Sequence, residues 1–287
     1  MMSLLLPGLF AGLVAVLVTV AIERFGGRVG GLLGTLPTTI VPASLGIFAE
    51  TDAEGLGHAM YAVPAGMLLN AGFLWLWRAV PPRLPSLPLG PRLAGMTVVS
   101  MGAWFAGALG LVMTLSALDG STMGLRLAGW GATAAIVVVG AVACLRSVPA
   151  PKGSRPVGLG TLLARGLLAG LAIATAVWIS RVGGPLAAGV ASVFPAIFVT
   201  TMVSLWLAQG EAVPSGAVGP MMLGSAAVAT YALFAAAALP ALGPWLGTLV
   251  AWVAAVGTTT VPAWWWLGRR AAQAEAVRPR GPASPSR

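Results

Sequence analysis

The sequence GGRVGGLLGTLPTTIVPASLG, residues 26–46, opens on paired glycines and carries two prolines inside an otherwise apolar stretch. Residues 183–201, GGPLAAGVASVFPAIFVTT, repeat this order in a milder form. A proline inside a helix removes a backbone donor, and glycines favour bending of the helix. We therefore predict that both stretches form membrane helices that are kinked or broken.

The composition of the chain places these stretches in a membrane protein. Of 287 residues, 58% are hydrophobic and 8% are charged, whereas about a quarter of the residues in soluble domains are charged. The chain divides into apolar segments of about 20 residues, which is the length of a helix that crosses a bilayer. The predicted fold is an all-α, polytopic transmembrane helix bundle. Nine spans are predicted, at residues 4–22, 29–49, 57–77, 92–116, 123–145, 160–179, 185–208, 215–238 and 242–267.

Positive charge is distributed unevenly over the breaks between these spans. Arg126 and Arg181 lie in breaks on one side. The basic residues on the other side are Arg24, Arg28, Arg78, Arg83, Arg92, Arg146, Lys152, Arg155, Arg165, Arg269, Arg270, Arg278, Arg280 and Arg287. Cytoplasmic segments of membrane proteins are enriched in Lys and Arg. This pattern predicts a bacterial cytoplasmic (inner) membrane protein with its N-terminus outside and its C-terminus in the cytoplasm, and it argues against a nucleic-acid partner despite the net charge of +9.

Similarity between the two halves extends beyond the proline segments. Residues 4–13, LLLPGLFAGL, match residues 162–171, LLARGLLAGL, and the Leu-Gly-Pro sequence at residue 89 recurs at residue 242. We predict two four-helix repeats with a connector helix between them and a basic, disordered cytoplasmic tail. The corresponding boundaries are 1–118 for the first repeat, 119–150 for the connector, 151–267 for the second repeat and 268–287 for the tail.

The single connector span has a geometric consequence. After four spans and one more, the second repeat begins on the opposite side of the membrane, which gives the two repeats inverted topology. Inverted repeats of this kind are the architecture of many secondary transporters. The alternative is chance similarity among helices that are rich in Ala, Gly and Leu.

The two proline segments are also the candidate binding site. Where a helix is interrupted inside a membrane, unwound backbone and helix ends can coordinate an ion or a substrate. The hydroxyls available for this role belong to Thr35, Thr38, Thr39, Ser44, Ser192, Thr200 and Thr201. The residues expected to break the helices are Gly30, Gly31, Pro37, Pro42 and Pro195. The alternative is that Gly, Ser and Thr mediate close helix packing and that the prolines only bend the helices.

The residue types that most catalytic and metal sites need are scarce. His58 is the only histidine and Cys144 the only cysteine, and the sequence lacks the common nucleotide-binding, zinc-protease and serine-hydrolase motifs. We therefore expect no catalytic residues, no metal site and no cofactor. A cation site in an external loop is a further alternative to simple solvation of that loop, with Glu50, Asp52, Glu54 and His58 as its members.

The double-Gly segment that leads into a membrane-embedded Leu-Pro or Phe-Pro resembles the GlpM-type family of small bacterial membrane proteins. In this chain the resemblance covers about 25 residues in each half, at GGRVGGLLGTLPTTIVPASLG and GGPLAAGVASVFPAIFVTT. The chain departs from the family in carrying two copies of the motif. The resemblance implies a membrane protein and no particular substrate.

These features favour a small inner-membrane permease or exporter of an unknown small solute or ion, with its site between the second and seventh spans. Without a nucleotide-binding motif, its transport would be gradient-driven or facilitated. A non-transporting scaffold or accessory subunit of an envelope assembly is the main alternative, and a membrane enzyme acting on lipid-linked substrates is a weaker one. The lipid bilayer is the expected partner, and association into a homo-oligomer is left open.

Overall fold

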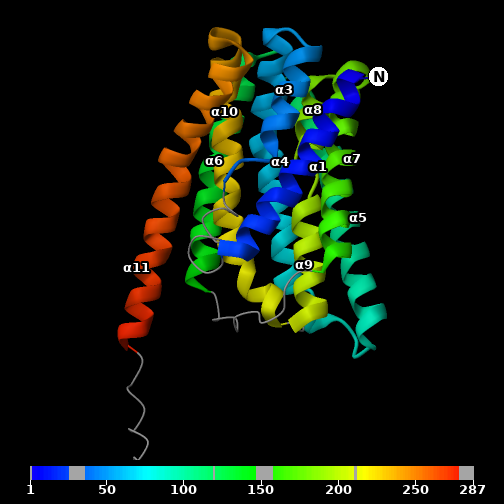
Figure 1. Ribbon diagram of the computed structural model, residues 1–287, viewed down its shortest axis with the longest axis vertical. Helices are drawn as coiled ribbons and strands as arrows, with labels where there is room; N and C mark the ends of the chain where they lie inside the picture. Colours follow the sequence, from blue (N-terminus) through cyan, green and yellow to red (C-terminus); the bar gives the residue numbers. More distant parts are fainter. Residues whose placement is uncertain (1, 26–35, 119, 147–157, 210–211, 278–287) are drawn as a thin grey trace, which may run out of the picture.

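The described part of the chain is a bundle of helices (Figure 1). The computed structural model describes residues 2–25, 36–118, 120–146, 158–209 and 212–277, and no strand occurs within these ranges. The prediction of an all-α protein is therefore confirmed for them. The helices are α1 (Met2–Phe25), α3 (Ile40–Glu50), α4 (Ala53–Ala79), the 3-10 turn η1 (Pro81–Arg83), α5 (Leu89–Ser116), α6 (Thr122–Leu145), α7 (Leu159–Val182), α8 (Pro185–Ser192), α9 (Ala196–Gln209), α10 (Ala212–Ala255), the π-helical turn η2 (Val256–Thr260) and α11 (Val261–Val277).

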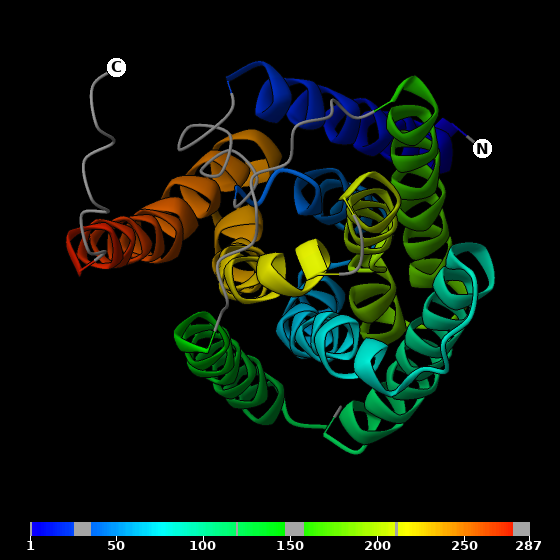
Figure 2. The same ribbon diagram turned by 90° about the horizontal axis from the view of Figure 1, so that it is seen from below.

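The helices form an inner group and an outer group. Figure 2 shows α3, α4, α8, α9 and the first part of α10 in the middle, with α1, α5, α6, α7 and α11 around them. The most apolar window is 61% buried in α4, against 17% in α5 and 28% in α6. The outer helices expose large apolar side chains such as Phe105, Val138 and Leu167. An apolar surface of this extent is suited to contact with lipid, so the chain is a membrane-embedded helical protein.

Six helices among the described residues are long and apolar enough to cross a membrane, so the predicted count of nine is not supported. One reason lies in α10, because the predicted spans 215–238 and 242–267 fall on the single candidate Ala217–Arg270. This stretch is bent sharply at Gly243, whose φ of 78° and ψ of 173° are readily adopted only by glycine. Beyond the bend the chain runs back along the outside of the bundle and continues into α11 (Figure 1).

The other reason lies near the N-terminus. Helix α1 has 24 residues, but the side chains that the structure describes in it lie within residues 6–17, so α1 is not among the six. Of the predicted span 29–49, only the short helix α3 and the residues just before it are described. The boundary between the two repeats also falls partly on residues 147–157, which lie outside the described residues. Nine spans therefore remain a proposal.

Helices α1 and α7, which contain matching sequences, pack directly against each other. A Cβ atom on Gly8 would lie 2.8 Å from the carbonyl oxygen of Gly170, and one on Gly12 would lie 2.8 Å from that of Gly166. Because the earlier residue of α1 contacts the later residue of α7, the two helices are antiparallel. We name these four residues the glycine seam. Glycine allows the two backbones to approach this closely, as in other small-residue contacts between membrane helices.

Charged side chains make contacts at both ends of the bundle. At the lower end in Figure 1, Arg78 at the end of α4 donates hydrogen bonds to the carbonyl oxygens of Ala143 (3.1 Å) and Arg146 at the end of α6. At the upper end, Arg181 of α7 forms an ion pair of 2.6 Å with Glu50 of α3. These contacts agree with charge at the two membrane surfaces.

Candidate functional site

The chain is interrupted at both proline segments. Helix α3 begins at Ile40, and residues 36–39, which include Pro37, are not helical. Pro42 lies in the first turn of α3, where a missing N–H costs no intrahelical bond, so it does not interrupt the helix. In the second segment, α8 ends at Ser192 and α9 begins after Pro195. Thr35, Gly30 and Gly31 lie outside the described residues.

Asn70 of α4 stabilises the interruption between α8 and α9. Its side-chain amide donates a hydrogen bond of 2.7 Å to the carbonyl oxygen of Val193, which has left the helix. Its side-chain oxygen accepts a hydrogen bond of 2.7 Å from the indole N–H of Trp104. The ring of Trp104 in turn meets the ring of Phe194 edge-on, with centroids 5.3 Å apart. Asn70 thus supplies the partner that an exposed backbone carbonyl needs inside a membrane.

Two of the predicted hydroxyls meet a buried arginine. Arg165 of α7 donates from Nε to Thr200 at 3.2 Å and from a terminal nitrogen to Thr201 at 3.1 Å, both on α9. The sequence interpretation had placed Arg165 in a cytoplasmic break, and that placement is wrong. The residue lies within α7 and is 7% exposed. Its guanidinium therefore reaches the interrupted helix from inside the apolar part of the bundle.

Ser44 meets a different partner. Its hydroxyl lies 2.8 Å from the hydroxyl of Tyr231 on α10, and both side chains are buried. Ser192, also buried, donates to the carbonyl oxygen of Gly189 within its own helix. Thr38 and Thr39 lie in the non-helical residues before α3 and are half-buried, and Thr39 makes no side-chain capping bond. The predicted hydroxyls that the structure describes are consequently spread over several places and do not gather into one site.

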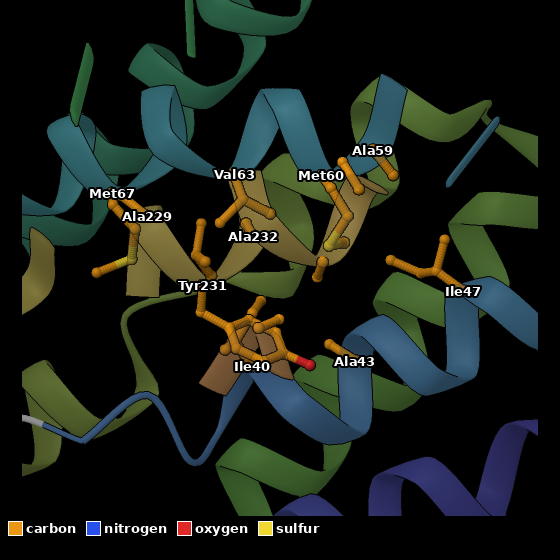
Figure 3. Close-up of a cluster of buried hydrophobic side chains, with 14 of the residues drawn as sticks. Ile40, Ala43, Ile47, Ala59, Met60, Val63, Met67, Ala229, Tyr231 and Ala232 are labelled. Atoms are coloured by element: carbon orange, nitrogen blue, oxygen red, sulfur yellow. The ribbon is translucent and has the colours of Figure 1, made fainter. Parts of the chain in front are cut away.

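The space between α3, α4 and α10 is filled mainly by apolar side chains. Figure 3 shows Ile40, Ala43 and Ile47 of α3 facing Met60, Val63 and Met67 of α4, with Ala229, Tyr231 and Ala232 of α10 beside them. The hydroxyl of Tyr231 is the polar group that points into this cluster, toward α3. The packing is close, since a Cβ atom on Gly189 of α8 would lie 2.0 Å from the carbonyl oxygen of Ala59 of α4.

The acidic residues at the junction of α3 and α4 have structural partners. Glu50 is paired with Arg181, and the carboxylate of Asp52 accepts a 2.8 Å hydrogen bond from the N–H of Gly55 at the start of α4. His58 lies 3.8 Å from Glu54. Within the described ranges, no three His, Cys, Asp or Glu side chains come together as a metal site would require. These partners give the loop a role in joining α3, α4 and α7.

Sequence reasoning missed Arg165, although a signal for it was present. The residue stands five positions into the predicted span 160–179, and the matching position of the first repeat, residue 7, is a proline. A charge inside an apolar segment is unusual enough to mark a candidate site. Asn70 and Tyr231 are also polar residues within predicted spans, but their partners between α8 and α9, on α5 and on α3 follow only from the tertiary structure.

The fold and these contacts define a helical membrane protein whose backbone is not helical at Pro37, just before α3, and between α8 and α9. Comparison of the chain with protein-family models, with curated proteins and with solved structures finds no match. The resemblance to the GlpM-type family accordingly stays a prediction.

Proposed function

We propose that the chain is a small permease or exporter of the bacterial cytoplasmic membrane, in which the solute passes between the interrupted helices α3 and α8–α9. The observation that carries the proposal is that the backbone is not helical at residues 36–39, before α3, or at residues 193–195, between α8 and α9, which are corresponding positions of two similar sequences. Interrupted helices of this kind lie beside the substrate in many secondary transporters, because their free backbone groups can bind it. We expect the protein to act without enzymatic chemistry or a cofactor.

The proposal includes an inverted repeat of four spans with a connector, and nine crossings in all. The antiparallel contact between α1 and α7 supports it, because the first helices of two units related by a two-fold axis in the membrane plane run in opposite directions. The glycine seam is also reciprocal, since the pairs Gly8–Gly170 and Gly12–Gly166 exchange places under such an axis. In addition, α4 packs extensively against α10, which holds the corresponding place in the second unit.

A seam of glycine backbones suits movement of one unit against the other. The closest approaches between α1 and α7 join glycine backbones, so at these points no side chain must change rotamer when the helices slide. Alternating access in inverted-repeat transporters is largely such a rocking of one unit against the other around a fixed site.

A second candidate function is a non-transporting scaffold or accessory subunit of an envelope assembly. The apolar filling between α3, α4 and α10 favours it, because a permanently dry centre offers no path for a solute. In this case the glycines and prolines would serve helix packing, and the exposed faces of the outer helices would include a surface for a partner.

Thiol labelling separates the two functions. In a Cys144→Ser background, the single variants Thr38→Cys and Thr201→Cys are treated with a membrane-impermeant thiol reagent from either side of the membrane. Transport predicts that both positions react, because water must reach the interrupted helices. The control is Met202→Cys, since Met202 is fully buried among apolar side chains next to Thr201 and is expected not to react.

Size-exclusion chromatography and tryptophan fluorescence first establish that each variant is folded. The labelling of the folded variants then decides between the two functions. Labelling at Thr38 and Thr201, with Met202 protected, supports an aqueous path. Failure of both positions to react from either side contradicts transport and leaves the scaffold function.

A further inference from the structure

Four arginines lie close together at the lower end of the bundle in Figure 1. Arg78 stands on the last turn of α4, Arg146 directly follows α6, and Arg269 and Arg270 belong to α11. Arg78 donates hydrogen bonds to the last carbonyl oxygens of α6. The guanidinium groups of Arg78 and Arg270 both lie close enough to the thiol of Cys144 on α6 to act on it electrostatically. We name these four arginines the arginine cluster.

The arginine cluster gathers positive charge at one place. Among the residues that the structure describes, none of the four arginines forms an ion pair with an acidic side chain, and the pair of Glu50 with Arg181 lies at the opposite end of the bundle. The side chain of Arg146 is exposed, and those of Arg78 and Arg270 are half-buried. Charges of one sign that are grouped in this way attract a ligand of the opposite sign.

Two tryptophans orient the arginines of α11. The guanidinium carbon of Arg269 lies 3.7 Å from the ring centroid of Trp265, and that of Arg270 lies 5.2 Å from the ring centroid of Trp266. A guanidinium that lies over an aromatic ring keeps the N–H donors at its edge available to an acceptor. Trp265 is itself 53% exposed, and exposed tryptophans are typical of the interface between lipid and water. Both arginines are therefore held at the level of lipid headgroups.

One terminal nitrogen of Arg270 lacks an acceptor. Its Nη1 atom is buried and has no hydrogen-bond partner among the described residues. A buried donor of a charged group without an acceptor is costly, so an acceptor from outside the chain would be bound favourably here. A phosphate oxygen is such an acceptor, and a phosphate can accept two parallel hydrogen bonds from one guanidinium.

The neighbouring protein surface is suited to the acyl chains of a lipid. Helix α11 packs mainly against η2, which precedes it, and lies at the rim of the bundle beside α6 (Figure 2). Val261 and Trp264 of α11 and Leu145 of α6 expose their apolar side chains. An apolar surface next to a basic cluster fits a molecule that has both acyl chains and a negatively charged headgroup. A soluble anion would leave the apolar part of this surface unused.

We infer that the arginine cluster binds the headgroup phosphate of an anionic phospholipid, whose acyl chains lie against the exposed apolar side chains of α6 and α11. The inference does not depend on the proposed transport function. The alternative is the general attraction between any interfacial arginine and an anionic membrane, which Arg83 at the same end of the bundle would share. A site for one lipid depends instead on particular arginines, so substitutions distinguish the two.

The experiment is native mass spectrometry of the purified full chain in detergent, with added phosphatidylglycerol or phosphatidylcholine that have the same acyl chains. The share of protein that carries one lipid gives the dissociation constant of the first bound lipid. The wild type is expected to bind phosphatidylglycerol about tenfold or more tightly than phosphatidylcholine. In the double variant Arg269→Gln, Arg270→Gln the dissociation constant of phosphatidylglycerol is expected to rise about tenfold or more, since each basic residue near an anionic lipid contributes a factor of roughly five.

Arg83→Gln is the matched control, because it removes an exposed arginine from the same end of the bundle and should leave the binding of phosphatidylglycerol near the wild-type value. If the double variant does not fold, Arg269→Gln and Arg270→Gln replace it separately, each with an expected rise of about fivefold. Equal binding of the two lipids by the wild type, or folded Arg269 and Arg270 variants that bind as Arg83→Gln does, would overturn the inference. Release of phosphatidylglycerol by an equal concentration of inorganic phosphate would also overturn it, since the site would then be one for a soluble anion.

Discussion

Leucine in place of Gly12 is expected to destabilise the protein severely or to prevent its folding. A Cβ atom at this position would lie 2.8 Å from the carbonyl oxygen of Gly166, and a backbone atom of a packed helix cannot move aside as a flexible side chain would. The helices α1 and α7 would have to separate along the whole seam. Overpacking a close contact typically costs about 1–3 kcal/mol, and contact with backbone puts this variant at or above about 3 kcal/mol. An unfolding midpoint lower by about 6–12 °C is the expected reading.

The seam makes a second variant informative. Gly166→Leu replaces the facing glycine and is expected to show a defect of the same size, because its Cβ atom would lie 2.7 Å from Val16 and 3.2 Å from the carbonyl oxygen of Gly12. Gly102→Leu is the matched control. Gly102 is an exposed glycine within α5 with nothing within 4 Å of an added Cβ atom, so its midpoint should stay near that of the wild type. Seam variants as stable as Gly102→Leu would show that α1 and α7 are not in contact.

Asn70→Leu is expected to produce the second large effect. The leucine has the same branched shape but leaves the carbonyl oxygen of Val193 and the indole N–H of Trp104 without their present partner. Interhelical hydrogen bonds in membrane proteins contribute about 0.6 kcal/mol on average and up to about 1.7 kcal/mol. With two groups orphaned at a buried position, the expected loss is about 2–3 kcal/mol. Thermal unfolding by tryptophan fluorescence measures it.

Trp104→Phe is the companion variant for Asn70. It removes one of the two hydrogen bonds and preserves the bond from Asn70 to Val193, so its loss should be about half as large or less. Equal stability of Asn70→Leu and the wild type would mean that the interruption between α8 and α9 does not depend on Asn70.

The membrane class and the helical fold follow from the sequence alone. Long apolar segments with few charges are suited to lipid, and in lipid a helix satisfies the hydrogen-bonding groups of its backbone within the segment. The matched segments identify α1 and α7 as corresponding helices, but their similarity carries no information about the contact between them, which only the structure shows. The span count is harder to predict. Hydropathy separates helices only where a polar break intervenes, and the bend at Gly243 is made by a Leu-Gly-Pro sequence within an apolar stretch.

The candidate site was less predictable than the fold. Sequence reasoning selected hydroxyls near the prolines, but a serine or threonine in a helix can bond to its own backbone, as Ser192 does. Whether a hydroxyl faces another helix depends on how its own helix is rotated about its axis. Because these helices are apolar on every side, the sequence has no periodicity from which that rotation can be inferred. Thr201 meets Arg165 and Ser44 meets Tyr231 through such rotations. The charge pattern misplaced Arg165 because its position near the end of an apolar run resembles that of an interfacial anchor.

The central claim is that two units of opposite orientation carry the interrupted helices, and the sidedness of α1 and α7 tests it most directly. In a Cys144→Ser background, one variant carries a cysteine in a short N-terminal tag and the other is Gly158→Cys, at the start of α7. Each is treated with a membrane-impermeant thiol reagent in intact spheroplasts and again in inverted vesicles. The account predicts that the N-terminal cysteine reacts in spheroplasts and that the cysteine at position 158 reacts only in inverted vesicles. Reaction of both cysteines from the same side would contradict the inverted repeat and, with it, the transport mechanism built on it.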